Sequence, residues 1–221
     1  MLDLPLPFLK RPAAPATPQP WLLVLMHGVG SNERDLFSLA GQVPDRFCVL
    51  SLRAPNRMGP GAFSWFDFSI EPGGTRAIDA VQEAASRALV AQVLVMASQQ
   101  LGIPPERVVV GGFSQGGIMA LSLLLTRPDL LRAAMVWHSR LLPEVLALSA
   151  PAEALRGHAL WVSHGTHDNV IPLAHAHAIR HHMQTLPVRL AYEEFPGLHE
   201  IRPAELAHSM AWLEALGTAP P

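Results

Sequence analysis

This chain has few charged residues and a single cysteine, and both shortages exclude classes of protein. Cys48 is the only cysteine among the 221 residues, so no disulfide can form within the chain, in agreement with a reducing compartment. Its 16 Lys and Arg against 18 Asp and Glu give a formal net charge of -2. Without a broad basic surface, we expect no nucleic-acid partner.

Long apolar runs are also missing, because proline, glycine or charge interrupts each candidate before it reaches membrane-spanning length. The first 20 residues, MLDLPLPFLKRPAAPATPQP, lack the basic start and continuous apolar core of a signal peptide. We therefore expect a soluble, cytoplasmic protein without stable membrane insertion. Residues 1–20 are expected to form an extended Pro-rich segment, and residues 21–221 a single domain.

What the sequence does contain is a regular alternation of short apolar runs and helical patterns. The runs predict strands at Trp21–Met26, Phe47–Leu52, Arg107–Gly111, Ala133–Trp137, Ala159–Ser163 and Val188–Phe195. Helices are predicted at Glu33–Ala40, Ala77–Gln100, Gln115–Thr126, Leu173–Thr185 and Pro203–Leu216. Most strand runs are continuously hydrophobic, which is typical of parallel strands buried on both faces. We expect an α/β fold with a mostly parallel central sheet, helices on both faces and no large lid domain.

The sequence GGFSQGG places Ser114 between a β-branched run and an apolar helix, with Gly112 and Gly116 on either side. This G-x-S-x-G pattern is typical of a sharp strand-to-helix turn that holds a serine hydroxyl above the sheet. Ligands of such sheets collect beyond the carboxyl ends of the strands, which is where Ser114 falls. Ser114 is therefore the candidate nucleophile.

A serine needs a base and a group that orients the base, and in this fold class both follow the serine in the sequence. Of the two downstream aspartates, Asp129 precedes a strand and falls at the opposite edge, whereas Asp168 follows one and falls at the same edge as Ser114. Asp168 is the candidate acid, with a helix-capping role as the alternative.

Histidines are numerous, so their position relative to the strands decides between them. His199 follows the last predicted strand in FPGLHE and is the candidate base. His164 and His167 share a tight loop with Asp168, which makes them poorer candidates. Five other downstream histidines fall on predicted helices: His175, His177, His181, His182 and His208. His177 and His181 are spaced to share a helix face, but without H-E-x-x-H we expect no functional metal.

Two loops complete the predicted site. The sequence HGVG after the first long strand predicts that the backbone N–H groups of Val29 and Gln115 form an oxyanion hole, with His27 structural. The long region 53–76 has no clear secondary structure and contains AFSWFDF. Its aromatic side chains predict either a substrate wall or a small core that packs the loop. The expected substrate-binding residues are Trp65, Phe66, Val170 and Leu198.

Together the segments HGVGS, WFD, GGFSQGGIMAL, HGTHDNVIP and GLHE resemble the phospholipase/carboxylesterase family of small α/β hydrolases, in the correct order from Trp21 to Leu216. The resemblance implies Ser114, Asp168 and His199 as a catalytic triad and Val29 and Gln115 as oxyanion donors. It also implies a cofactor-free enzyme that hydrolyses small-molecule or lipid esters or thioesters and is often a homodimer. This chain departs from the family at WHSRLLPE, where members often show Ser-Gly, and in the short segment after WFD.

The sequence therefore predicts a serine carboxylesterase that works through an acyl-enzyme. An acyl-protein thioesterase or lysophospholipase for long acyl chains is the first alternative. A non-catalytic binding protein of the same fold is less favoured, because all three triad residues are present.

Overall fold

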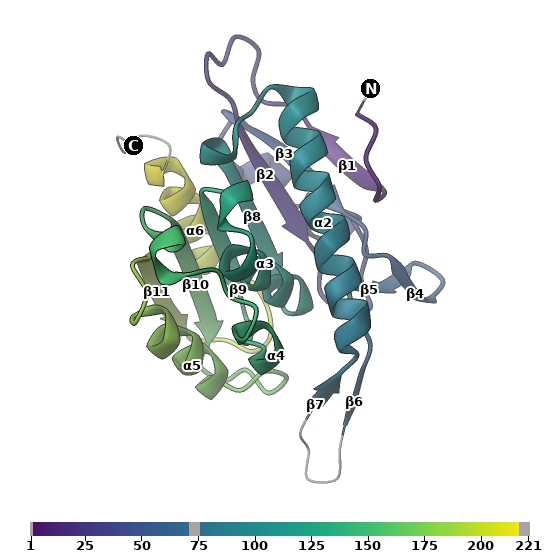
Figure 1. The fold of residues 1–221 in the computed structure, drawn as a ribbon, viewed down its shortest axis with the longest axis vertical. Helices are drawn as coiled ribbons and strands as arrows, with labels where there is room; N and C mark the ends of the chain where they lie inside the picture. Colours follow the sequence, from purple (N-terminus) through teal and green to yellow (C-terminus); the bar gives the residue numbers. More distant parts are fainter. Residues whose placement is uncertain (1, 71–75, 217–221) are drawn as a thin grey trace.

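The computed structural model describes residues 2–70 and 76–216, and within these ranges the chain folds around a seven-stranded sheet (Figure 1). The strands lie in the order β1-β3-β2-β8-β9-β10-β11. Strand β1 is antiparallel to β3, and the other neighbours are parallel. Their bounds are β1 (Phe8–Arg11), β2 (Trp21–Met26), β3 (Phe47–Leu52), β8 (Val108–Phe113), β9 (Ala133–Trp137), β10 (Ala159–Gly165) and β11 (Arg189–Phe195). Residues 71–75, which belong to the short segment after WFD, lie outside the described residues. Residues 217–221, the end of the expected domain, also lie outside them.

Helices cover both faces of this sheet, with α2 in front and α6 behind in Figure 1. Their bounds are α1 (Arg34–Phe37), α2 (Ala80–Leu101), α3 (Gln115–Thr126), α4 (Pro143–Leu146), α5 (Ala174–Met183) and α6 (Pro203–Leu216). Alternate residues of each strand face opposite layers: in β2, Leu22 and Val24 join the core under α2, α3 and α5, whereas Leu23 and Leu25 join the core under α1 and α6. The predicted α/β class without a large lid is confirmed.

The ends of α2 follow from two residues that the apolar pattern alone does not reveal. The side chain of Asp79 accepts the N–H groups of Val81 and Gln82, both at 3.0 Å, so the helix begins at Ala80 rather than at residue 77. Gly102 has a φ of 65° and ends the helix in the left-handed conformation.

The N-terminal segment is not the extended lead-in that its proline content predicts. Strand β1 pairs with β3 at the edge of the sheet, and Leu6 lies in the core. The Arg11 guanidinium donates four hydrogen bonds of 2.7 to 3.0 Å to backbone carbonyls of segment 40–47. Residues 6–11 therefore belong to the domain. A short edge strand next to prolines carries too weak a pattern to be predicted.

The region 53–76 also holds more structure than predicted. Two hairpins form there, β4 (Asn56–Gly59) with β5 (Ala62–Ser64), and β6 (Phe68–Ile70) with β7 (Arg76–Ile78). Gly61 takes a φ of 71° in the first hairpin turn. Strands of three or four residues are too short for alternation to be visible in the sequence.

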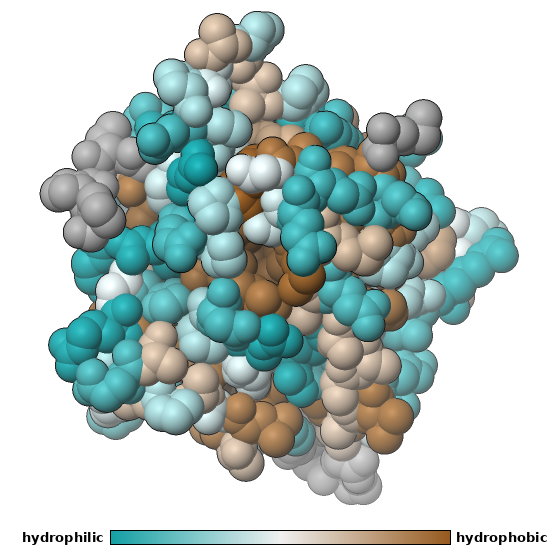
Figure 2. Space-filling view, turned by 45° about the horizontal axis from the view of Figure 1, so that its top comes forward, coloured by the Kyte–Doolittle hydropathy of each residue, from teal (hydrophilic) through white to brown (hydrophobic). Residues whose placement is uncertain are grey.

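None of the described helices is long and apolar enough to cross a bilayer. On the face shown in Figure 2, hydrophilic and hydrophobic residues intermix, and hydrophilic residues border an apolar area near the centre. The cytoplasmic location and the homodimer stay predictions.

We predict that Arg11→Ala lowers the free energy of unfolding by about 3 kcal/mol, because it leaves four partly buried carbonyls without their donor. Arg57→Ala, an exposed arginine in β4, should change it by about 0.5 kcal/mol or less. Urea unfolding measures both. Equal effects of the two substitutions would show that the N-terminal segment is not anchored to the domain.

Candidate active site

Ser114 lies at the turn between β8 and α3 with φ 54° and ψ −116°, a backbone conformation that residues other than glycine rarely adopt. Such a conformation typically costs about 1–3 kcal/mol and persists only where neighbours hold it. Here the Ser114 N–H donates to the Trp137 carbonyl at 2.9 Å, and the Ser139 hydroxyl donates to the Ser114 carbonyl at 2.8 Å. The predicted strand-to-helix turn is confirmed, and strand β9 holds it.

The flanking glycines have a direct steric reason. A Cβ on Gly112 would overlap the Gly116 carbonyl, and a Cβ on Gly116 would overlap the Met26 carbonyl at the end of β2. Both obstacles are backbone atoms and cannot rotate away. The start of α3 is therefore pressed against β8 and β2, which fixes the height of Ser114 above the sheet.

The loop after β2 passes directly beside Ser114. A Cβ on Gly28 would lie 3.5 Å from the Ser114 Cβ. The next residue, Val29, is exposed, and in the described part of the chain its N–H has no hydrogen-bond acceptor. Gln115 is the first residue of α3, so its N–H has no acceptor within the helix. Both amides are available as donors next to the serine.

His27 supports this loop, as expected. Its Nδ1–H donates to the Gly28 carbonyl at 2.7 Å, and its Nε2 accepts the Ala54 N–H at 3.1 Å. Burial lowers the pKa of His27, so its ring is neutral in the pH range where proteins work.

The aromatic segment contributes less to the surface than predicted. Trp65 is fully buried, and its indole N–H donates to the His27 carbonyl at 2.9 Å. The Gln115 amide fixes the same segment, because it accepts the Trp65 N–H at 2.8 Å and donates to the Phe66 carbonyl at 2.6 Å. Its contacts show Trp65 packing the loop, which is the alternative to a substrate wall, and Trp65 does not line the cavity at Ser114; its assignment to substrate binding stays a prediction. Phe66 is also buried but reaches the lining of a cavity at Ser114.

Asp168 and His199 meet although they come from different loops. The Nδ1 of His199 lies 2.6 Å from Oδ2 of Asp168. The other oxygen, Oδ1, accepts the N–H groups of Val170 and Ile171 at 2.9 and 2.8 Å. Burial opposes the charge, but the hydrogen bonds from His199 and from the two amides outweigh it and lower the pKa of Asp168. Asp168 is therefore an ionised carboxylate that fixes the His199 ring. Val170 and Leu198, predicted to bind substrate, are both exposed nearby.

A second histidine reaches the same carboxylate, and the sequence-based choice of residues missed it. His138 follows β9, and its Nδ1 lies 3.1 Å from Asp168 Oδ2. Its Nε2 lies 3.1 Å from Glu205 Oε2 in the first turn of α6. Burial lowers the pKa of His138, but the hydrogen bonds and charges of Glu205 and Asp168 outweigh burial and raise it. The rule that selected His199, a position just after a strand, could also have selected His138.

His164 completes a cluster with His138 and Asp168 whose ligand atoms are close enough to hold a metal ion. Its Nε2 lies 2.7 Å from the Ile171 carbonyl, so this nitrogen carries a proton and cannot serve as a ligand in this arrangement. Burial lowers the pKa of His164, so the ring is neutral. On α5, the Nε2 of His177 bonds to Glu194 at 2.9 Å. One nitrogen of each of these two rings is therefore held by a hydrogen bond.

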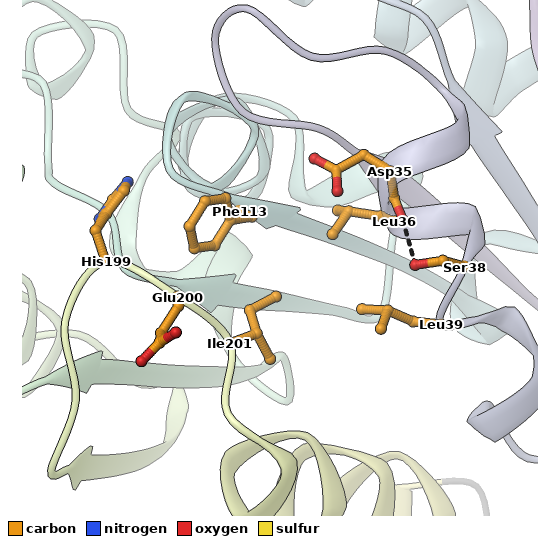
Figure 3. Close-up of a pocket in the computed structure, with 8 residues that line it drawn as sticks. All are labelled: Asp35, Leu36, Ser38, Leu39, Phe113, His199, Glu200 and Ile201. Carbon is orange, nitrogen blue, oxygen red and sulfur yellow. Dashed lines mark hydrogen bonds between the residues drawn. The ribbon is translucent and has the colours of Figure 1, made fainter.

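Two cavities flank the reacting groups. One of about 20 Å³ is lined by Val29, Phe66, Phe68, Ser114, Gln115, Ile118, Arg140 and Ile171. The other, of about 280 Å³, is lined by Asp35, Leu36, Ser38, Leu39, Phe113, His199, Glu200 and Ile201 (Figure 3). Figure 3 shows that Phe113 and His199 form one side of the larger cavity and that α1 and the residues after it form the other. Ser114 thus opens on the smaller cavity, and His199 on the larger.

The parallel sheet, the turn at Ser114 and the Asp168–His199 pair are those of an α/β hydrolase. Within that class, the chain belongs to the Phospholipase/Carboxylesterase family, whose sequence profile matches residues 10–216.

Relatives of known name agree with this assignment. A probable carboxylesterase of Oryza sativa subsp. japonica is 36% identical over 117 residues, which are 51% of this chain and 43% of that protein. Acyl-protein thioesterase 1 of Gibberella zeae is 34% identical over 115 residues, 51% of this chain and 49% of the thioesterase. The chain thus spans about half the length of these curated relatives. The crystal structure of a Bacillus cereus carboxylesterase shares the fold, with a TM-score of 0.81 at 22% identity over 96% of this chain and 95% of that one.

The buried His138–Glu205 pair should make stability depend on pH in a defined direction. Because the folded-state pKa of His138 is raised, its contribution is complete below about pH 6.5 and is lost as the pH rises through the folded-state pKa. Glu205→Gln should therefore lower the free energy of unfolding by about 3 kcal/mol at pH 6 and by less at pH 9. Thermal unfolding across this range measures the difference. Glu193→Gln, which removes the partner of the exposed His208, is the control and should show little effect. A Glu205→Gln effect that grows with pH would contradict the assignment.

Proposed function

We propose that this chain is a serine carboxylesterase in which Ser114 is the nucleophile, His199 the base and Asp168 the residue that orients the base. The observation that carries the proposal is the 2.6 Å contact between His199 Nδ1 and the ionised Asp168. A carboxylate accepts only, so the proton of the neutral ring is on Nδ1 and the lone pair is on Nε2. This is the tautomer that a general base for a serine requires.

The reaction follows in two halves. Ser114 Oγ attacks the ester carbonyl carbon while His199 Nε2 takes the hydroxyl proton, and the N–H groups of Val29 and Gln115 bind the oxyanion. Collapse of this intermediate breaks the bond to the alcohol, which leaves with the proton from His199. Water then attacks the acyl-enzyme and gives a proton to His199. The bond between the acyl carbon and Ser114 Oγ breaks as His199 returns that proton to Oγ, which releases the acid and the free serine. No cofactor takes part in these steps.

The two cavities support an assignment of the two halves of the ester. The acyl carbon is bound to Ser114 and its oxygen to Val29 and Gln115, so the acyl group belongs in the cavity that these residues line. The leaving alcohol must reach His199 to receive its proton, so it belongs in the cavity that His199 lines. With room for little more than one water molecule, the acyl side suits a short acyl group such as acetyl.

The side chains that line the larger cavity indicate which alcohols it can bind. Leu36, Leu39 and Ile201 supply apolar contacts, whereas the exposed side chains of Asp35 and Glu200 bring negative charge to its lining. Anions are repelled by such a surface. The cavity therefore favours neutral or cationic alcohols over leaving groups that carry a phosphate.

A second candidate function is a thioesterase or lysophospholipase for long acyl chains, favoured by the similarity to an acyl-protein thioesterase. That function needs the acyl chain in the larger, apolar cavity, with the polypeptide or glycerophosphate on the other side. The orientation of the substrate therefore separates the two candidates.

We predict that Ser114→Ala lowers the kcat of p-nitrophenyl acetate hydrolysis at least about 10⁴-fold, because the acyl-enzyme can no longer form. Ser122→Ala, a buried serine further along α3, should retain activity. Full activity of Ser114→Ala would exclude the proposed nucleophile.

We further predict that kcat/KM falls at least about tenfold from acetyl to octanoyl esters of one alcohol, because the longer acyl group exceeds its cavity. Leu39→Trp should lower kcat/KM for 1-naphthyl acetate about tenfold through loss of space for the alcohol, and leave methyl acetate unchanged. A steady-state panel of esters measures both. If octanoyl esters react best and Leu39→Trp blocks them selectively, the acyl chain occupies the larger cavity. That result would favour the thioesterase or lysophospholipase over the carboxylesterase.

A further inference from the structure

His138 is held in place by burial, by its backbone conformation and by hydrogen bonds. Its side chain is buried, and it stands at a φ of 49°, in the left-handed region where histidine is uncommon. The His138 N–H donates to the Ser163 carbonyl at 2.9 Å and holds this backbone between β9 and β10. The strained position aims the ring between the carboxylates of Asp168 and Glu205.

Glu205 is the second carboxylate that this ring contacts. It is fully buried, and its Oε1 accepts the Ser163 hydroxyl at 2.6 Å. Its Oε2 accepts the Arg202 N–H at 3.3 Å and faces His138 at 3.1 Å. Among the described residues, His138 is the one cationic group paired with Glu205. A buried carboxylate without such a partner is strongly destabilising, so the pair is a unit.

The contacts of the ring indicate that both nitrogens carry protons. Each lies 3.1 Å from a carboxylate oxygen, and a carboxylate can only accept. The Gly165 N–H also points to Nδ1, at 3.4 Å. This contact is longer than the 3.1 Å contact between Nδ1 and Asp168, so we take the shorter one to determine the protonation of Nδ1. His138 between two anions is therefore an imidazolium, as the direction of its pKa shift also indicates.

We propose that His138, braced by Glu205, is a positioning residue of the esterase: a buried imidazolium that shares Asp168 Oδ2 with His199 and lowers the pH above which His199 can act as a base. The proposal rests on the function proposed above. It assigns to His138 a role through Asp168 and His199, without contact with the substrate.

The direction of the effect follows from charge. The groups around the two rings are Asp168 from the loop after β10, Glu205 from α6, the neutral His164 from β10, and on the outer side Asp35 and Glu200. The rings of His138 and His199 have centroids 5.7 Å apart. A cation at that distance disfavours a second proton on His199, and it also takes part of the Asp168 charge that would hold such a proton. Removing the cation should therefore keep His199 protonated, and inactive, to a higher pH.

The test is the pH dependence of kcat/KM for p-nitrophenyl acetate in a set of variants. His138→Asn tolerates the left-handed backbone and removes the charge, and Glu205→Gln is isosteric and removes the support for the imidazolium. Both should move the acid limb of the profile upward by on the order of one pH unit. His208→Asn removes an exposed histidine–glutamate pair from the same helix and should leave the limb in place. Should His138→Asn fail to fold, Glu205→Gln carries the test.

A merely structural His138 gives a different result: kcat falls at every pH and the acid limb does not move, which overturns the proposal. Nitrogen-15 NMR of histidine-labelled wild-type protein supplies a readout independent of activity. We expect both ring nitrogens of His138 to be protonated at pH 7, and a neutral ring would also overturn it. If Ser114→Ala stays active, the proposed esterase function is wrong, while the NMR result still shows whether His138 is an imidazolium paired with Glu205. If Ser114→Ala is inactive and the limb is unmoved, only the role of His138 fails.

Discussion

The carboxylate of Asp168 is the interaction on which the site depends. One oxygen is held by two backbone amides of its own loop, and the other meets the rings of His199 and His138. Among the described residues, its ion-pair partners are all histidines, so its negative charge is stabilised by amide dipoles and imidazole rings rather than by lysine or arginine. The protonation of those rings therefore governs the electrostatics of the site.

The sheet delivers these groups in a simple way. Strands β8, β9, β10 and β11 are neighbours in space, and each contributes a residue just beyond its carboxyl end: Ser114, His138, Asp168 and His199. Parallel pairing places all four ends at one edge. The close approach of backbone at Gly112 and Gly116 then sets the serine at the start of α3, beside the loop that carries Val29. The site is a consequence of register and strand order more than of any long-range loop closure.

The fold and the candidate site differ in how far the sequence could predict them. The buried strands and the turn at Ser114 can be predicted from local sequence patterns. Asp168 and His199 can be selected because each follows the end of a predicted strand. Trp65 could not be placed, because an aromatic cluster in a long region looks the same whether it lines a cavity or fills the core. Glu205 resembles any acidic residue at a helix start, and its burial depends on His138, distant in the sequence. Strand β1 is stabilised by β3 and by carbonyls that bind Arg11, neither of which its own residues reveal.

The dependence of Ser114 on the Asp168 carboxylate is measured most directly by the rate at which a fluorophosphonate labels Ser114 in Asp168→Asn. Asparagine keeps the size of the side chain but removes the charge and permits the wrong His199 tautomer. We expect labelling at least about 10³-fold slower than in the wild type, in a protein that still unfolds cooperatively. Labelling at the wild-type rate would contradict this expectation, because Ser114 would then be activated without the carboxylate.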